Sequence, residues 1–269
     1  MMRLIQIEWL KIKSLKALWI MTALYFIALI MVSVGAKSGL DFLTAKGMDF
    51  NGINPSIVPL YAYDDLWQNL AYMASFFKIF PAFILIISMS NEFTYRTHRQ
   101  NVIDGLSRSE FLLSKMSFAA FLALLSAVVL LLLGFLLGSL HSDVRGTEYM
   151  FQSIEFVLAH ALQFFIYFTG AMLLVLWIRR SGISIVLLLL YTLLLERIIT
   201  GILRLALSWD DVINFFPLRA INRLVPNPFG KYIFQETQTF LGLQDLAIAL
   251  LWLGLFTFGI HWQLRKRDF

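Results

Sequence analysis

The stretch Phe118–Leu140 reads FAAFLALLSAVVLLLLGFLLGSL and carries no charged residue. A helix needs about 20 mainly apolar residues to cross the hydrocarbon core of a membrane, so this segment alone predicts a membrane-spanning helix. The whole chain has the same character: of its 269 residues, 59% are hydrophobic and 14% are charged, with a mean hydropathy of +0.75. Soluble domains carry roughly 25% charged residues. The composition therefore predicts an integral membrane protein.

Six apolar segments are long enough to cross a membrane. They are continuous runs rather than the alternating, roughly ten-residue strands of an outer-membrane barrel, so we expect an all-α integral membrane protein with six transmembrane helices. We interpret residues 1–269 as a single transmembrane domain, with spans at about 17–34, 71–90, 118–140, 154–178, 182–203 and 246–264.

Two flanking segments predict helices that do not cross the membrane. Residues 1–16 carry an apolar stripe of Ile5, Trp9 and Ile12, interrupted by Glu8, together with several lysines. Such a segment favours a short interfacial helix on anionic lipid. The last external loop, residues 208–242, is amphipathic and rich in proline. We expect it to form interfacial or re-entrant helices.

The orientation follows from the distribution of Lys and Arg, which favour cytoplasmic loops. With the N-terminus in the cytoplasm, thirteen Lys and Arg residues lie inside and six lie outside. This count predicts a multi-pass protein of the inner (cytoplasmic) membrane with both termini cytoplasmic. The segment between the second and third spans then faces the cytoplasm.

The sequence lacks the motifs of several enzyme classes. There is no cysteine, no pair of histidines at metal-binding spacing, no nucleophile elbow and no phosphate-binding loop. We therefore expect no catalytic residue and no metal site in this chain. The net charge of +5 is modest, and no basic patch with interleaved aromatic residues predicts nucleic-acid binding.

Several polar residues lie inside the apolar spans. Lys78 is interpreted as snorkelling towards the outer interface. The fourth span carries a stripe of polar residues and one glycine, and the fifth carries a charged pair: His160, Gln163, Tyr167 and Gly170, and Glu196 and Arg197. These residues either line a translocation path or bond to neighbouring helices and to one another, and both readings stay open.

Residues 90–115, SNEFTYRTHRQNVIDGLSRSEFLLSK, interrupt the apolar pattern with mixed charge. Asp104-Gly105 is a turn signal, and Gly105 suits the end of a helix. Ser107 and Glu110 have the spacing of a capping box. We expect a short cytoplasmic helix that ends near Gly105, and a new helix from Arg108 that continues as the third span.

This segment resembles the cytoplasmic coupling segment of type-2 ABC exporter permeases. That family shows a Glu, a Thr-x-Arg element, a Gly- or Pro-Leu/Ile-Ser-Arg element, an aromatic residue and a Lys. The matching positions are Glu92, Thr97, Arg99, Gly105, Leu106, Ser107, Arg108, Phe111 and Lys115. Arg96 stands where the family usually has a glycine before the threonine. The six-span plan and the basic N-terminal helix also fit the family.

The resemblance implies the permease subunit of an ATP-driven exporter. Two such chains, as a homodimer or a heterodimer, would recruit two separate ABC ATPase subunits, which would bind the ATP and Mg that this chain does not bind. The residues implied to couple to the ATPase are Glu92, Thr97, Arg99, Gly105, Ser107, Arg108 and Lys115. The alternatives are a membrane scaffold or sensor module without transport activity and, after these, an intramembrane enzyme.

Overall fold

The computed structural model describes residues 8–48, 59–95, 107–142, 147–207, 209–229 and 241–266, and every regular element within these ranges is a helix. The prediction of an all-helical chain is confirmed for this part of the sequence. Five helices are long and apolar enough to cross a membrane, and a bent pair makes a sixth candidate span.

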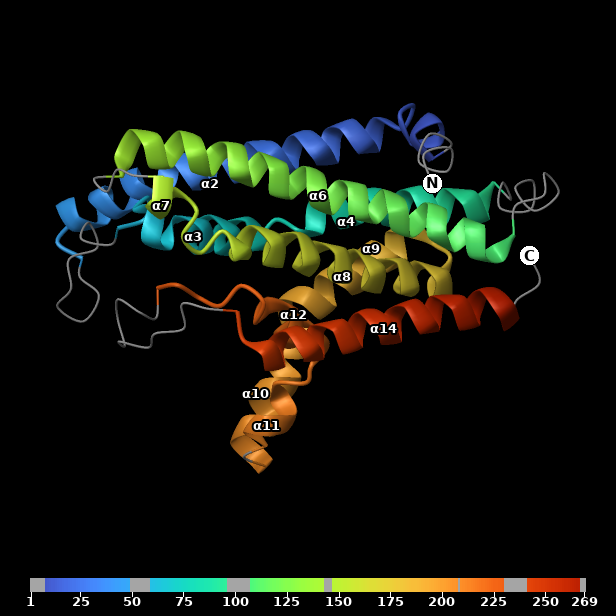
Figure 1. Ribbon diagram of the computed structural model, residues 1–269. Helices are drawn as coiled ribbons and strands as arrows, with labels where there is room; N and C mark the ends of the chain where they lie inside the picture. The colour runs from blue at the N-terminus through green and yellow to red at the C-terminus, as the bar shows by residue number, and fades with distance from the viewer. Residues whose placement is uncertain are drawn as a thin grey trace.

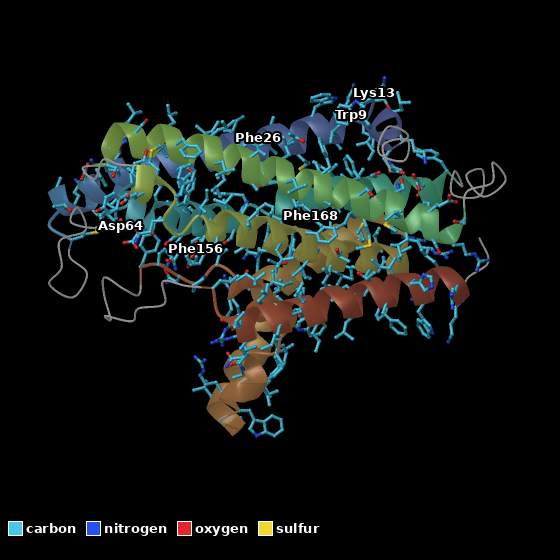
Figure 2. All side chains as sticks on the ribbon, in the orientation of Figure 1. Trp9, Lys13, Phe26, Asp64, Phe156 and Phe168 are labelled. Carbon is cyan, nitrogen blue, oxygen red and sulfur yellow. The ribbon has the colours of Figure 1, made fainter. Side chains whose placement is uncertain are left out.

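The longest helices run alongside one another in a bundle (Figure 1). They are α2 (Lys16–Ala45), α6 (Arg108–His141), α8 (Glu155–Ile178) and α14 (Leu243–Lys266). Helix α8 lies at the centre, because it packs against α3, α4, α6, α9, α12 and α14. Figure 2 shows Phe156 and Phe168 of α8 inside the bundle, where both are fully buried, whereas Trp9 and Lys13 point outward.

The second span differs most from its predicted extent. Instead of one helix over residues 71–90, the chain forms α3 (Tyr63–Ser75) and α4 (Ile79–Thr94), which meet at an angle of 46°. Pro81 gives the reason, because its ring clashes with the carbonyl group four residues earlier, at Phe77, and its nitrogen has no hydrogen to donate. Proline is tolerated in the first turn of α4, so the helix restarts after the break.

Helix α3 extends the span into a polar region that hydropathy does not detect. Gln68 and Asn69 are buried, and they donate hydrogen bonds to the carbonyl oxygens of Pro226 (3.2 Å) and Leu60 (3.0 Å). Buried amides are tolerated where they find such partners. The first span is longer too, since α2 continues eleven residues beyond Val34 to Ala45.

The fifth span leaves the bundle. It consists of α9 (Ser181–Leu190), a π-helical segment (Tyr191–Leu195) and α10 (Glu196–Leu207), and only 17% of its apolar part is buried, compared with 61% for the span that contains α8. Figure 1 shows α10 and the short α11 (Asp210–Ile213) projecting from the side of the bundle.

The last external loop folds back into the molecule. After α11, the helix α12 (Pro217–Asn222) packs against α8 and α14. Its Leu218, Ala220 and Ile221 are buried. Short helices are therefore present in the described part of this loop, and one side of α12 is buried against α8 and α14. The remaining short helix, α7 (Thr147–Met150), precedes α8 and packs against α3.

Candidate functional site

The helix α6 begins with the capping box that the sequence predicts. The Ser107 hydroxyl accepts a hydrogen bond from the Glu110 backbone N–H (3.2 Å), and the Glu110 carboxylate accepts one from the Ser107 N–H (2.8 Å). Two of the free N–H groups at the start of the helix are satisfied in this way. The predicted start of the helix at Arg108 is confirmed.

About two turns into α6, Lys115 lies in a buried cluster of charged residues. Its ammonium group donates to Glu8 Oε2 at 2.6 Å and to Glu92 Oε1 at 2.8 Å. Lys11 contacts the same two carboxylates at the edge of the cluster, Glu92 Oε1 at 3.2 Å and Glu8 Oε1 at 3.7 Å. We call these four residues the ionic cluster. It joins the N-terminal segment, the end of α4 and the start of α6.

The ionic cluster is nearly closed to solvent. The side chains of Glu8, Glu92 and Lys115 are 2%, 7% and 3% exposed, whereas that of Lys11 is 32% exposed. Burial on its own raises the pKa of the Glu8 carboxyl, but Lys115, Lys11 and a hydrogen bond to Ser114 together hold that pKa below its usual value of 4.5. Glu8 is therefore held in its charged form.

The ionic cluster shows which side of the N-terminal helix faces the protein. Residues 8–12 are helical, but the side that faces the protein carries Glu8 and Ile12, both 1% exposed, while Trp9 is 40% exposed. Glu8, which interrupts the apolar stripe in the sequence, is the residue that ties this segment to the bundle. Residues 1–7 lie outside the described part of the chain.

The other residues predicted to couple to the ATPase differ in their exposure. Arg108 is exposed, and its Nη1 donates to the carbonyl oxygen of Arg265 (3.1 Å), so the end of α14 lies beside the start of α6. Thr97, Arg99 and Gly105 lie outside the described residues, as does the expected helix before Gly105. Glu92 and Lys115, by contrast, are turned inward.

The stripe on α8 is held by bonds to neighbouring helices. His160 Nε2 lies 2.7 Å from Ser126 Oγ on α6, and this hydroxyl is also hydrogen-bonded to Tyr25 on α2. Gln163 Nε2 donates to Asn222 Oδ1 on α12 (3.2 Å). The Tyr167 hydroxyl lies 2.8 Å from Thr192 Oγ1 in the fifth span. His160 and Gln163 are fully buried, whereas Tyr167 lines a cavity described below.

Glu196 and Arg197 lie in different environments, because the first side chain is buried and the second is exposed. Glu196 is buried at the start of α12, where its carboxylate accepts the backbone N–H groups of Leu218 (2.9 Å) and Arg219 (2.6 Å). A carboxylate at this position also interacts favourably with the helix dipole. The Tyr191 hydroxyl donates to the same carboxylate (2.6 Å). Arg197 is exposed on α10, so the two residues do not form one patch.

The interpretation of Lys78 as a snorkelling residue is wrong. The residue is 4% exposed and its ammonium group donates to Asn222 Oδ1 at 2.5 Å. It also lies over the ring of Tyr167. The reason is the return of α12 into the bundle, which brings a polar acceptor to the break between α3 and α4.

Sequence reasoning missed two members of the ionic cluster, Glu8 and Lys11. The sequence feature that could have revealed them is the charged residue Glu8 on the apolar side of a short helix. Burial of such a charge is unfavourable unless an oppositely charged group lies against it. Within the described ranges, no group of three or more His, Cys, Asp and Glu side chains is arranged to hold a metal ion.

Comparison of the sequence with models of protein families assigns the chain to a family. Searches against curated proteins and against solved structures give no match. Residues 4–195 match the model of a family described as ABC-2 family transporter protein. The match covers most of the chain and includes the ionic cluster and the segment from Glu92 to Lys115. The chain therefore belongs to the ABC-2 family of transporter proteins and is a multi-pass ABC transporter permease.

Proposed function

We propose that this permease belongs to an ATP-driven exporter and that the ATPase acts on the segment between Glu92 and Lys115. The observation that carries the proposal is the contact between the two ends of this segment. Glu92 closes α4 and Lys115 lies near the start of α6, and their side chains meet at 2.8 Å. The salt bridge thus ties the end of α4 to the first turns of α6, the two helices that flank the segment.

This arrangement would allow the segment to transmit a movement of the ATPase to the spans. A force on the segment is passed to α4 and α6 together, because the salt bridge keeps their ends from separating. The same lysine bonds to Glu8, so the N-terminal segment moves with them. ATP-driven closure of the ATPase can shift the spans only if it favours one of two arrangements, and a stiff joint between three elements supports such a shift.

The rest of the assembly follows from this proposal. Two ABC ATPase subunits bind the ATP and Mg, and a second permease chain, identical or related, completes the membrane part. The end of the bundle with residues 8–12, the start of α6 and the end of α14 faces the cytoplasm. The basic residues at this end support that orientation under the positive-inside rule: Lys11, Lys13, Lys16, Arg108, Arg179, Arg180, Arg265 and Lys266.

The test uses the permease reconstituted in vesicles with its ATPase. Arg108→Glu reverses a charge at the exposed base of the segment, and like charges across an interface cost several kcal/mol. We expect ATPase binding to weaken by about tenfold or more and the stimulation of ATP hydrolysis by the permease to fall with it. Membrane insertion should stay normal, because Arg108 lies outside the buried core.

Lys37→Glu is the matched control. It reverses an exposed charge on α2, in the part of the chain that the proposal puts near the outer face. This variant should bind the ATPase and stimulate it like the unmodified chain. Equal ATPase binding by the Arg108 and Lys37 variants would contradict the proposed docking segment, and a permease that retains no ATPase at all would favour a scaffold or sensor.

A further inference from the structure

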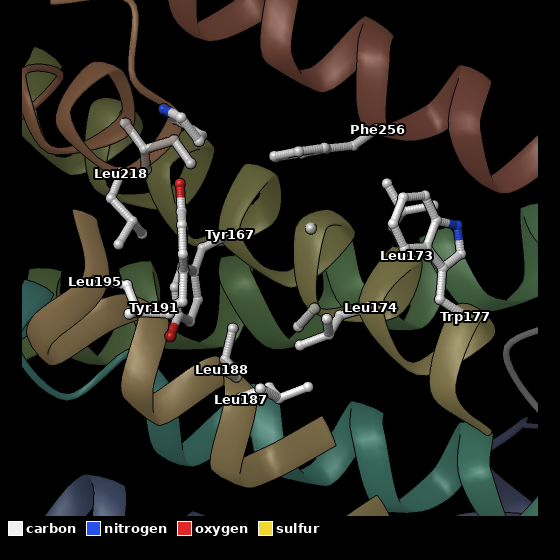
Figure 3. Close-up of a pocket in the computed structure, with 14 residues that line it drawn as sticks. Tyr167, Leu173, Leu174, Trp177, Leu187, Leu188, Tyr191, Leu195, Leu218 and Phe256 are labelled. Carbon is white, nitrogen blue, oxygen red and sulfur yellow. The ribbon is translucent and has the colours of Figure 1, made fainter. Parts of the chain in front are cut away.

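A cavity of about 340 Å³ lies between α8, α12, α14 and the π-helical part of the fifth span. This volume is within the range of small-molecule sites, roughly 300–1,000 Å³. Figure 3 shows Leu218 and Trp177 at its two ends and Phe256 opposite Tyr167 and Tyr191. Isolated π-helical turns are frequent at functional sites, and here Tyr191 and Leu195 of that turn form part of the wall.

The cavity offers its occupant almost no hydrogen-bonding group. Its two tyrosine hydroxyls are already bonded elsewhere, Tyr167 to Thr192 (2.8 Å) and Tyr191 to Glu196 (2.6 Å). Apart from the indole N–H of Trp177, the other lining side chains carry no polar group. A polar ligand would lose its hydration here without replacement, so the chemistry selects a hydrocarbon chain.

The length of the cavity matches one leaflet of a membrane. Along α8 it extends from Tyr167 to Trp177, which is ten residue steps, or about 15 Å at the rise of an α-helix. Half of the roughly 30 Å hydrocarbon core is the same length. One acyl chain of a single leaflet therefore fits along this wall.

One end of the cavity carries an aromatic residue and positive charges, which are the features expected where the headgroup of a bound lipid would lie. Trp177 lines the cavity and is 58% exposed, as expected for a tryptophan at the membrane interface. Arg179 and Arg180 follow at the end of α8 and join it to α9; both are exposed, and the Arg179 guanidinium lies over the ring of Phe93. Paired arginines at this level attract an anionic headgroup.

We propose that this cavity holds an acyl chain of an anionic phospholipid whose headgroup lies at Arg179 and Arg180. Under the orientation given above, on which this detail rests, the lipid belongs to the cytoplasmic leaflet. The lipid then fills the space between α8, α9 and α14 and couples the packing of the loosely held fifth span to the composition of that leaflet.

The experiment uses the full chain in phosphatidylcholine vesicles with a small amount of phosphatidylglycerol that carries a photoactivatable diazirine on one acyl chain. After irradiation, mass spectrometry should find the label on the cavity-lining parts of α8, α9 and α14. Leu187→Trp fills the cavity and should lower this labelling about tenfold, as the displacement of two buried methylene groups would give.

Leu190→Trp is the control, because Leu190 lies on the same helix at similar exposure, 40% against 37% for Leu187, but does not line the cavity. It should leave the labelling unchanged, and thermal unfolding checks that both variants fold. Arg180→Gln tests the headgroup independently, and it should weaken the preference for labelled phosphatidylglycerol over labelled phosphatidylcholine, with Arg179 accounting for what remains.

Three results would overturn the proposal. These are equal labelling of the Leu187 and Leu190 variants, label confined to other parts of the chain, and an Arg180→Gln variant that keeps the full preference for phosphatidylglycerol. None of these readouts involves the ATPase, so failure of the coupling proposal leaves the lipid result interpretable.

Discussion

Lys115 holds together three elements that are remote in sequence. It is 107 residues from Glu8 and 23 residues from Glu92, and it bonds to both. A buried ion pair does not by itself stabilise a protein, because desolvation offsets the attraction between the charges. Removal of one partner is different, since it leaves the remaining charges buried and uncompensated.

We therefore expect Lys115→Met to destabilise the chain by about 3–5 kcal/mol, because two carboxylates would remain buried side by side. Thermal unfolding in mild detergent measures the loss. Lys11→Met is the control: its side chain is 32% exposed, so its loss should be at most about 1 kcal/mol. If both variants unfold at the same temperature, Lys115 is not the central cation of the ionic cluster.

Glu8 makes the same cluster sensitive to acid. Its pKa is lower in the folded chain than the usual value of 4.5. Its carboxylate therefore stabilises the fold fully above about pH 4.5, and this contribution is lost as the pH falls through the folded-state pKa. The groups that face it are Lys115, Lys11, Glu92 and Ser114.

Thermal unfolding from pH 7 downward should show a decline in stability below about pH 4.5 that is smaller in Glu8→Gln. At pH 7 this variant should be less stable than the unmodified chain, because Lys115 loses one of its two carboxylates. Identical pH profiles for the two proteins would show that Glu8 does not contribute to the acid dependence.

At the scale of the element, single residues decide where helices break and how closely they approach. Pro81 separates α3 from α4, and the break brings Lys78 within reach of α12. On α6, Gly134 leaves room for the fully buried ring of Trp67 on α3. That ring is fixed in turn by a hydrogen bond from its N–H to the carbonyl oxygen of Met150 (2.9 Å).

Gly134→Ala should destabilise the chain, because the added methyl group would collide with the Trp67 ring. Overpacking of this kind costs about 1–3 kcal/mol. Gly254→Ala on α14 is the matched control, since its methyl group would meet no atom within 4 Å, and alanine favours a helix by roughly 0.5–1 kcal/mol over glycine. Thermal unfolding should thus shift in opposite directions, and a shift in the same direction would contradict the close packing of α3 on α6.

At the scale of the whole molecule, burial is very uneven. Helix α8 is enclosed by six other helices, whereas the fifth span presents a long apolar surface, with Ile198, Ile202 and Leu205 exposed on α10. A second permease chain is the partner that the proposed function requires, and α10 projects away from its own bundle in Figure 1.

We expect Ile202→Cys to form a disulfide-linked dimer in membranes under mild oxidation, because we place Ile202 near the two-fold axis of a symmetric contact, where a residue meets its own copy in the other chain. The chain has no cysteine of its own, so the result is read directly from a non-reducing gel. Leu124→Cys on α6 has the same exposure, 57% against 58%, and should remain monomeric. Equal cross-linking of both variants would argue against a specific contact through α10.

Much of the fold follows from local patterns in the sequence. The uncharged run Phe118–Leu140 predicts its helix, and Ser107 with Glu110 predicts where that helix begins, because hydropathy and capping depend on neighbouring residues. The predicted second span is too short, because the amide side chains of α3, which are buried in the structure, lower the hydropathy of that part of the sequence. The candidate site was predicted in part: Glu92 and Lys115 were named from the family resemblance, but their contact with each other was not.

Local sequence patterns are enough to predict a helical membrane chain with apolar spans, a capped start of α6 and a charged segment before it. The tertiary structure alone decided that Lys115 pairs with Glu8, that Lys78 bonds to Asn222 at a separation of 144 residues, and that a cavity lies behind Tyr191. Local sequence patterns indicate where a single helix forms and where it begins. The partner of a buried charge and the shape of a cavity depend on which helices pack together, and this is set by the whole chain at once.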